Sequence, residues 1–123
     1  MPEALNIATV AHDTNWGNVG ANLGATERHV AEVLTRAAST DLILFPELSL
    51  TGYILDSSAV ALAQPLDGPT VMALRTMAAR HKVALAAGLI EAGPDRPYNT
   101  QVVVDSDGAF LAAGAPVYLV RGA

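Results

Sequence analysis

Two short runs of consecutive apolar residues, 42–45 and 83–90, constrain this chain most, because each has the length of a strand rather than of a helix. Apolar residues follow one another in both runs with little alternation, which is typical of strands covered on both faces of a sheet. Residues 5–11 form a third run with β-compatible residues, and we expect a first strand there. These runs predict an α/β protein with helices packed on a largely parallel sheet.

The segments between the apolar runs have the spacing of helices. Within residues 19–38 the apolar positions recur at helical intervals, with charged residues between them. A second helical pattern follows the turn at residues 65–69, and we expect it to stop by His81. The residues that mark its inner face are Val71, Leu74, Met77 and Ala78. Strands that alternate with helices predict that the first three strands are parallel.

The last part of the chain has the pattern of a hairpin. Residues 100–105 are expected to form a strand, and the turn Ser106-Asp107-Gly108 leads into a second strand at residues 109–113. The segment 118–120 is interpreted as the start of a further buried element. Because no repeat or linker is visible, residues 1–123 are predicted to be one domain or part of one.

Composition excludes several classes of function. The seven Lys and Arg residues are scattered, and the net charge is −5, so we expect no nucleic-acid binding. The apolar runs are far shorter than the ~20 residues that span a bilayer, and residues 1–10 do not resemble a secretion signal. We therefore expect no membrane partner and a cytoplasmic location.

Few residues could hold a metal or a cofactor. The chain has no cysteine, hence no thiolate ligand and no thiol nucleophile. His12, His29 and His81 lack metal-ligand spacing and are expected to be surface or cap residues. The glycines at 17, 20 and 24 fit neither the dinucleotide fingerprint nor the P-loop. We expect neither a metal nor a cofactor.

Glu47 is the first candidate for chemistry. It directly follows the predicted strand at 42–45, and ligands of α/β sheets bind beyond the carboxyl ends of parallel strands. Partial desolvation there would disfavour the charged carboxylate and suit a general base. A helix cap or a surface ion pair would explain the same residue structurally, so position alone leaves these roles open.

The residues around Glu47 resemble a known family. Phe-Pro-Glu-Leu-Ser-Leu-Thr-Gly-Tyr, residues 45–53, resembles the signature of the nitrilase superfamily of carbon-nitrogen hydrolases, in which this glutamate is the general base. Segments similar to other parts of the family occur in its order, at residues 6–10, 17–23, 66–69, 87–89, 98–100 and 105–108. The resemblance implies part of an α-β-β-α sandwich, and residues 1–123 then correspond to the first half of the family domain.

The resemblance also implies which catalytic groups are missing. The family hydrolyses its substrates with a cysteine nucleophile, the glutamate and a lysine that stabilises the developing negative charge. The cysteine position would lie beyond residue 123, and counting on from Gly108 brings the lysine position to Pro116, which carries no donor. Lys82 is the only lysine, and its place before the third strand predicts a solvated amine instead.

Three hypotheses on function remain. The first is a chain of a hydrolase family whose reaction is hydrolysis of a non-peptide carbon–nitrogen bond in a small amide, carbamoyl compound or nitrile, inactive alone because Cys and Lys are missing. The second is a half-enzyme completed by a partner chain, and the third is a non-catalytic binding or interaction module. Self-association is expected from the resemblance. Substrate-binding residues stay unassigned, and Trp16 is expected to cover the sheet edge rather than line a pocket.

Overall fold

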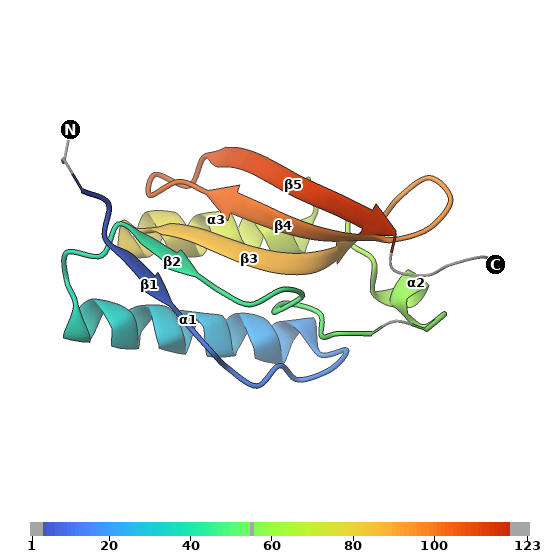
Figure 1. Cartoon of the computed structure of the whole chain (residues 1–123), viewed down its shortest axis with the longest axis horizontal. Coiled ribbons are helices and arrows are strands. Elements are labelled where there is room, and N and C mark those ends of the chain that lie inside the picture. The colour runs from blue at the N-terminus through green and yellow to red at the C-terminus, as the bar shows by residue number, and fades with distance from the viewer. Residues whose placement is uncertain (1–3, 55, 119–123) are drawn as a thin grey trace.

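The computed structural model describes residues 4–54 and 56–118 (Figure 1). The described elements are, in chain order, β1 (Ile7–Thr9), α1 (Val19–Arg36), β2 (Leu42–Leu44), α2 (Ala59–Leu62), α3 (Pro69–His81), β3 (Ala84–Glu91), β4 (Tyr98–Val104) and β5 (Phe110–Tyr118). No helix within these residues combines the length and the apolar character that crossing a membrane requires.

The five strands form one sheet of order β1-β2-β3-β4-β5. β1, β2 and β3 pair in parallel, which confirms the predicted direction of the first three strands. β4 pairs antiparallel with β3, and β5 pairs antiparallel with β4. The sheet is therefore parallel in β1, β2 and β3, whose connections contain the helices α1 and α3, and antiparallel in the hairpin of β4 and β5 (Figure 1).

The two long helices begin and end where local chemistry favours it. The side chain of Asn18 caps α1 by accepting a hydrogen bond from the Ala21 N–H at 2.9 Å. α3 begins with Pro69 at its first turn, and Lys82 follows its last residue in the left-handed conformation, with φ 55°. The predicted end of α3 at His81 is confirmed, whereas α1 ends two residues before the predicted position 38.

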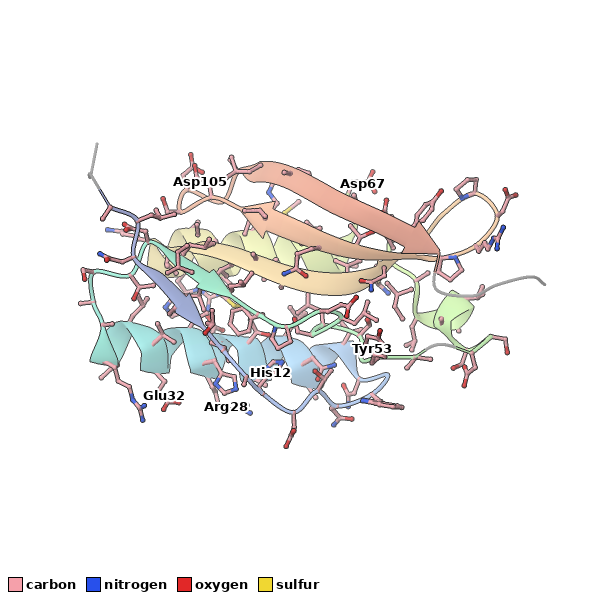
Figure 2. All side chains as sticks on the ribbon, in the orientation of Figure 1. His12, Arg28, Glu32, Tyr53, Asp67 and Asp105 are labelled. Atoms are coloured by element: carbon pink, nitrogen blue, oxygen red, sulfur yellow. The ribbon has the colours of Figure 1, made fainter. Side chains whose placement is uncertain are left out.

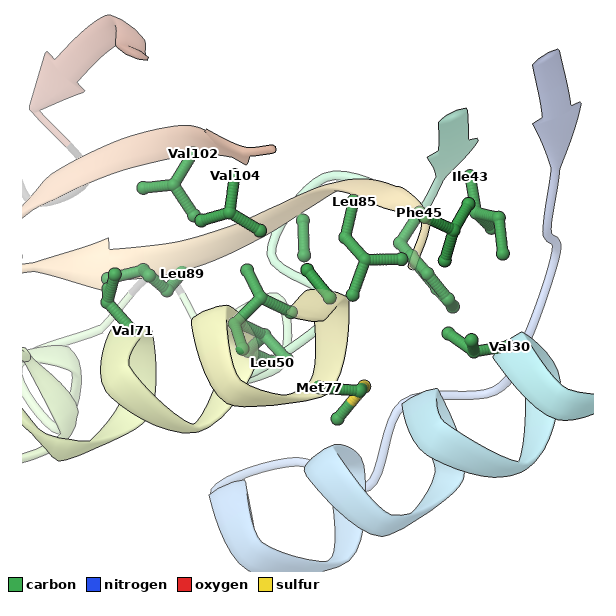
Figure 3. Packing of buried hydrophobic residues seen from close by; sticks show 14 residues of the cluster. Val30, Ile43, Phe45, Leu50, Val71, Met77, Leu85, Leu89, Val102 and Val104 are labelled. Carbon is green, nitrogen blue, oxygen red and sulfur yellow. The ribbon is translucent and has the colours of Figure 1, made fainter. Parts of the chain in front are cut away.

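The core lies between one face of the sheet and helices α1 and α3. The predicted inner face of α3 is confirmed, since all four of its residues are buried against the sheet. Figure 3 shows this packing, with the cyan turns of α1 and the yellow-green turns of α3 below the strands. Fully buried side chains of the strands on this face are Ile43, Leu85, Leu89, Val102 and Val104.

The opposite face of β1 and β2 is much less covered. Ile43 is fully buried, yet its neighbour Leu44 is 39% exposed, and Ile7 on β1 is 52% exposed. The prediction that residues 42–45 are covered on both faces is therefore wrong for the described chain. Successive side chains of a strand point to opposite faces, and here the described helices α1 and α3 pack on one face only.

The hairpin is longer than the sequence predicts. β4 and β5 extend to Tyr98 and Tyr118, and their turn is closed by hydrogen bonds from Asp105 N–H to Ala109 O at 2.8 Å and from Gly108 N–H to Asp105 O at 2.9 Å. Arg75 of α3 donates to Gly108 O at 2.7 Å, which ties the turn to the helix layer. The predicted element at 118–120 lies outside the described residues except for Tyr118, which ends β5.

Candidate active site

Glu47 lies in a tight turn that leaves and then rejoins the edge of β3. Before the turn, Phe45 N–H donates to Ala86 O at 2.8 Å, and after it Leu50 N–H donates to Gly88 O at 2.9 Å. The backbone is thus anchored to β3 on both flanks of Glu47. The turn lies at the carboxyl end of β2, where the predicted general base was expected.

Glycine at position 88 makes room for this turn. A Cβ atom there would lie 2.3 Å from Leu48 N and 3.1 Å from Glu47 C, so any larger residue would collide with the backbone. Leu48 has a positive φ of 53°, which is unusual for a leucine. Its side chain is fully buried against Ala59 and Ile90, and this packing holds the strained conformation.

β4 supplies polar side chains that hold the turn from the adjacent strand. Asn99 Nδ2 donates a hydrogen bond to Glu47 Oε1, and Gln101 Nε2 donates to Phe45 O at 3.3 Å. Asn99 pairs with Ile90 and Gln101 with Gly88 across the β3–β4 ladder, so both project from the face opposite the helices. The hydrogen bond from the Asn99 amide fixes the direction of the Glu47 carboxylate.

Glu47 itself is exposed in this chain. The expectation of a partly desolvated carboxylate is therefore wrong for the described residues. The turn projects over the sheet face that the helices do not cover, so water reaches the carboxylate. A dry site, in which a fixed charge acts most strongly on a reacting group, would need a further covering layer here.

Asn22 joins the loop after β1 to the Glu47 turn. It is 2% exposed, accepts from Asn15 N–H at 2.7 Å, and donates to Asn15 O at 2.8 Å and to Leu50 O at 3.0 Å. The sequence pointed to Asn22 only as one residue of the segment 17–23, which resembles the family. A polar residue on the inner face of a helix was the signal that could have identified it, because buried amides need partners.

Two aromatic side chains lie beside the Glu47 turn. Trp16 is 66% exposed and Tyr53 is 46% exposed, and together with Ile54, Asp56 and Ser58 they line a pocket of about 500 Å³. The expectation that Trp16 covers the sheet edge is wrong, since it packs on the loop that follows β2. Figure 2 shows Tyr53 on that loop, near the amino-terminal end of α1.

The histidines fall in two places. His81 Nε2 lies 2.9 Å from Glu27 Oε2, which also pairs with Arg80 Nη1 at 2.9 Å, so this cluster links α1 to α3. The ring of His12 lies tilted against that of His29, with ring centroids 5.1 Å apart, and both of its ring nitrogens are buried without a hydrogen-bond partner among the described residues. His12 is thus half-buried, and its ring nitrogens cap no helix among the described residues.

Burial lowers the pKa of His12, and the neighbouring His29 lowers it further. The charge of Asp13 opposes this shift more weakly. Because a buried imidazole is easier to accommodate without charge, the folded chain favours the neutral form of His12. Within the described residues, no group of three His, Cys, Asp or Glu side chains could hold a metal ion.

The strand pairing shows where Lys82 and Pro116 lie relative to Glu47. Lys82 is exposed and lies just before β3. Ala84, at the start of β3, pairs with Leu42 at the start of β2, whereas Glu47 follows the end of β2. Lys82 therefore lies at the opposite end of these strands from Glu47. Pro116 lies in β5, between the partners of Gln101 and Asn99, where the ladder has a register shift. A proline fits there because β5 is the last strand in the sheet order.

Comparison with known proteins places these features in a family. The family described as carbon-nitrogen hydrolase matches residues 6–119. An (R)-stereoselective amidase from Pseudomonas sp. is 34% identical over 95 residues, which cover 77% of this chain and 34% of that protein. An aliphatic nitrilase from Rhodococcus rhodochrous is 27% identical over 122 residues, covering 88% of this chain and 33% of the nitrilase.

A solved amidase from Nesterenkonia sp. superimposes with a TM-score of 0.76 at 25% identity. The match covers 89% of this chain and 41% of the amidase. The chain therefore spans about a third of the length of the curated relatives above and about two fifths of the solved amidase. The α/β fold predicted from the sequence is confirmed by this solved structure.

Proposed function

Because the chain belongs to the carbon-nitrogen hydrolase family, we propose that it supplies the general base, Glu47, for hydrolysis of the carbon–nitrogen bond in a small amide. The observation that carries this proposal is the Glu47 carboxylate held by Asn99 on a turn anchored to β3 on both flanks. Preorganised geometry of this kind is what proton transfer to a positioned base requires.

The names of the relatives favour amides over nitriles as substrates. The (R)-stereoselective amidase and a formamidase of Pseudomonas syringae pv. syringae are 34% and 39% identical over their matches, against 27% for the aliphatic nitrilase. The Nesterenkonia amidase has also been solved in complexes with acrylamide and with butyramide. Small aliphatic amides are therefore the substrates that we would test first.

In the proposed reaction, a thiol attacks the amide carbonyl carbon and Glu47 accepts its proton. The tetrahedral intermediate collapses when the carbon–nitrogen bond breaks and the glutamic acid returns the proton to the leaving amine. Water then releases the acid, with Glu47 again as base. Since the chain has no cysteine and has a proline at the lysine position, we propose that it does not turn over alone and that turnover needs both a thiol from outside these 123 residues and a lysine in place of Pro116.

A non-catalytic binding role is the second candidate. It is favoured by Pro116 at the lysine position and by an aromatic-lined pocket that needs no nucleophile to bind a ligand. The two candidates differ in whether restoring the missing groups restores turnover.

The first experiment measures ammonia release by the purified chain from acetamide, butyramide, a carbamoyl compound and a nitrile. Its size is determined by sedimentation on the same sample over a range of concentrations. We expect no turnover and self-association. Turnover that disappears in Glu47→Gln would show that another nucleophile operates in this chain, and a monomer at every concentration would contradict the expected association.

The second experiment restores the missing groups. Residues 6–119 replace the matching segment of the Nesterenkonia amidase, with and without Pro116→Lys. We expect ammonia release from butyramide only with Pro116→Lys, and its loss on adding Glu47→Gln. The matched control is Glu32→Gln, which removes an exposed carboxylate of α1 that pairs with Arg36. Full activity of the Glu47→Gln chimera would overturn the assignment of Glu47.

A further inference from the structure

The pocket beside the Glu47 turn has features of a ligand site in its own right. Its volume of about 500 Å³ falls in the range of small-molecule sites. It is formed by the loops that follow β1 and β2, at the carboxyl ends of two parallel strands. Ligands of open α/β sheets bind in this position.

The aromatic wall of the pocket is held in place by close backbone contacts. Gly52 has φ 98°, and a Cβ atom there would lie 2.9 Å from Trp16 Cα and 3.2 Å from the Trp16 ring. Gly17 N–H donates to Thr51 O at 2.9 Å, which fixes the loop on the other side of Trp16. Trp16 is therefore anchored through its backbone while its side chain stays largely exposed.

Asp56 places a negative charge in the same pocket. Its Oδ1 accepts hydrogen bonds from Ser58 Oγ and from Ser58 N–H, the latter at 2.9 Å. These bonds lower the pKa of Asp56, with the hydroxyl contributing more than the backbone N–H, so the carboxylate is ionised at neutral pH. None of the described residues that line the pocket is a lysine or an arginine.

We propose that this pocket binds an organic cation, namely an alkylammonium group. Tryptophan and tyrosine rings attract cations through their quadrupoles, and a carboxylate in the same pocket adds a charge of the required sign. A neutral apolar ligand would use the rings but not Asp56, and an anion would be repelled. The net charge of −5 also favours the approach of a cation.

The test uses the intrinsic fluorescence of the whole chain. Trp16 is its only tryptophan, so the emission reports on one wall of the pocket. The chain is titrated with n-butylammonium chloride and, separately, with the neutral isostere 1-butanol at an ionic strength matched with KCl. We expect a saturable change in Trp16 emission with butylammonium and a weaker, non-saturating change with butanol.

Two variants separate charge recognition from a general effect on the loop. Asp56→Asn keeps an oxygen acceptor for Ser58 but removes the charge, and Tyr53→Leu removes one ring while Trp16 remains as the probe. Each is expected to weaken butylammonium binding roughly three- to tenfold. Glu32→Gln, the matched carboxylate on α1, is expected to leave the affinity unchanged.

Three results would overturn the proposal: no saturation with butylammonium, an equal response to butanol, or an unchanged affinity in Asp56→Asn. The measurement needs no turnover. Failure of cation binding therefore leaves the assignment of Glu47 standing, and an inactive chimera leaves the cation site standing.

Discussion

The two faces of the sheet differ in what covers them. On the face that packs against α1 and α3, Ile43, Leu85 and Val104 are fully buried. On the other face, Ile7 and Leu44 are partly exposed. Only part of β3 is covered there, because Leu48 of the Glu47 turn and Ala59 of α2 pack on Ile90 of β3.

The two faces therefore contribute differently to stability and to the candidate site. The helix-covered face buries large apolar side chains and provides most of the hydrophobic stabilisation, which scales with the apolar area removed from water. The other face carries Asn99 and Gln101, whose amides hold the Glu47 turn instead of filling a core. The candidate site is thus built on the face that contributes less to folding.

The largest expected effect comes from a truncation on the helix-covered face. Leu85→Ala should lower the free energy of unfolding by about 2–5 kcal/mol, because it leaves a cavity among fully buried neighbours. Leu44→Ala, the matched change on the other face, should stay within about 1 kcal/mol. Urea unfolding measures both, and equal losses would show that the two faces are equally covered in solution.

A second prediction concerns the contact between β3 and the Glu47 turn. Gly88→Ala should destabilise the chain by about 1–3 kcal/mol, because the added methyl group meets the backbone of Leu48. Gly114→Ala on β5 is the control, since a Cβ atom there has no neighbour within 4 Å. Thermal unfolding of both variants tests this, and a neutral Gly88→Ala would mean that the turn lies farther from β3.

A third prediction concerns how β4 orients the Glu47 carboxylate. Asn99→Leu should lower stability by less than about 1 kcal/mol, because the lost hydrogen bond is exposed to solvent. The Glu47 side chain should then average over several rotamers, which three-bond NMR couplings detect. Gln101→Leu, which removes only the bond to Phe45 O, should leave the Glu47 rotamer unchanged. Unaltered couplings in Asn99→Leu would contradict the positioning role.

The smallest effect is expected from pH. Because the pKa of His12 is lower in the folded chain than its ordinary value of about 6.5, the unfolded chain binds more protons as the pH falls. The stabilisation is therefore complete above about pH 6.5 and is lost as the pH falls through the lowered pKa. His12→Gln should flatten this part of a plot of stability against pH, and an unchanged slope would assign it to other groups.

The sequence predicts the element order well because the strands and helices have different apolar spacing. The inner face of α3 and the parallel pairing of β1, β2 and β3 follow from that spacing alone. The exposure of one face of β2 does not follow from the spacing. A run of apolar residues shows that a strand could be buried on both faces, but it does not show which other elements are present to bury it.

The candidate site was predictable only in part. The segment around Glu47 identified this residue as the candidate general base, and the sequence contains no cysteine that could act as a thiol nucleophile. The hydrogen bond from Asn99, the exposure of Glu47 and the pocket of Trp16 and Asp56 were not predicted. Each depends on residues distant in the chain or on how a loop folds back, and short-range patterns do not report such contacts.

The sequence by itself determined which residues can form strands, which helix faces turn inward, and that these 123 residues contain no cysteine, because periodicity and residue chemistry are local properties. Only the tertiary structure decided that Gly88 must be small, that β4 orients Glu47, and that two aromatic side chains and a carboxylate share one pocket. These contacts join segments far apart in the chain, and their geometry is fixed only when the strands pair and the loops pack.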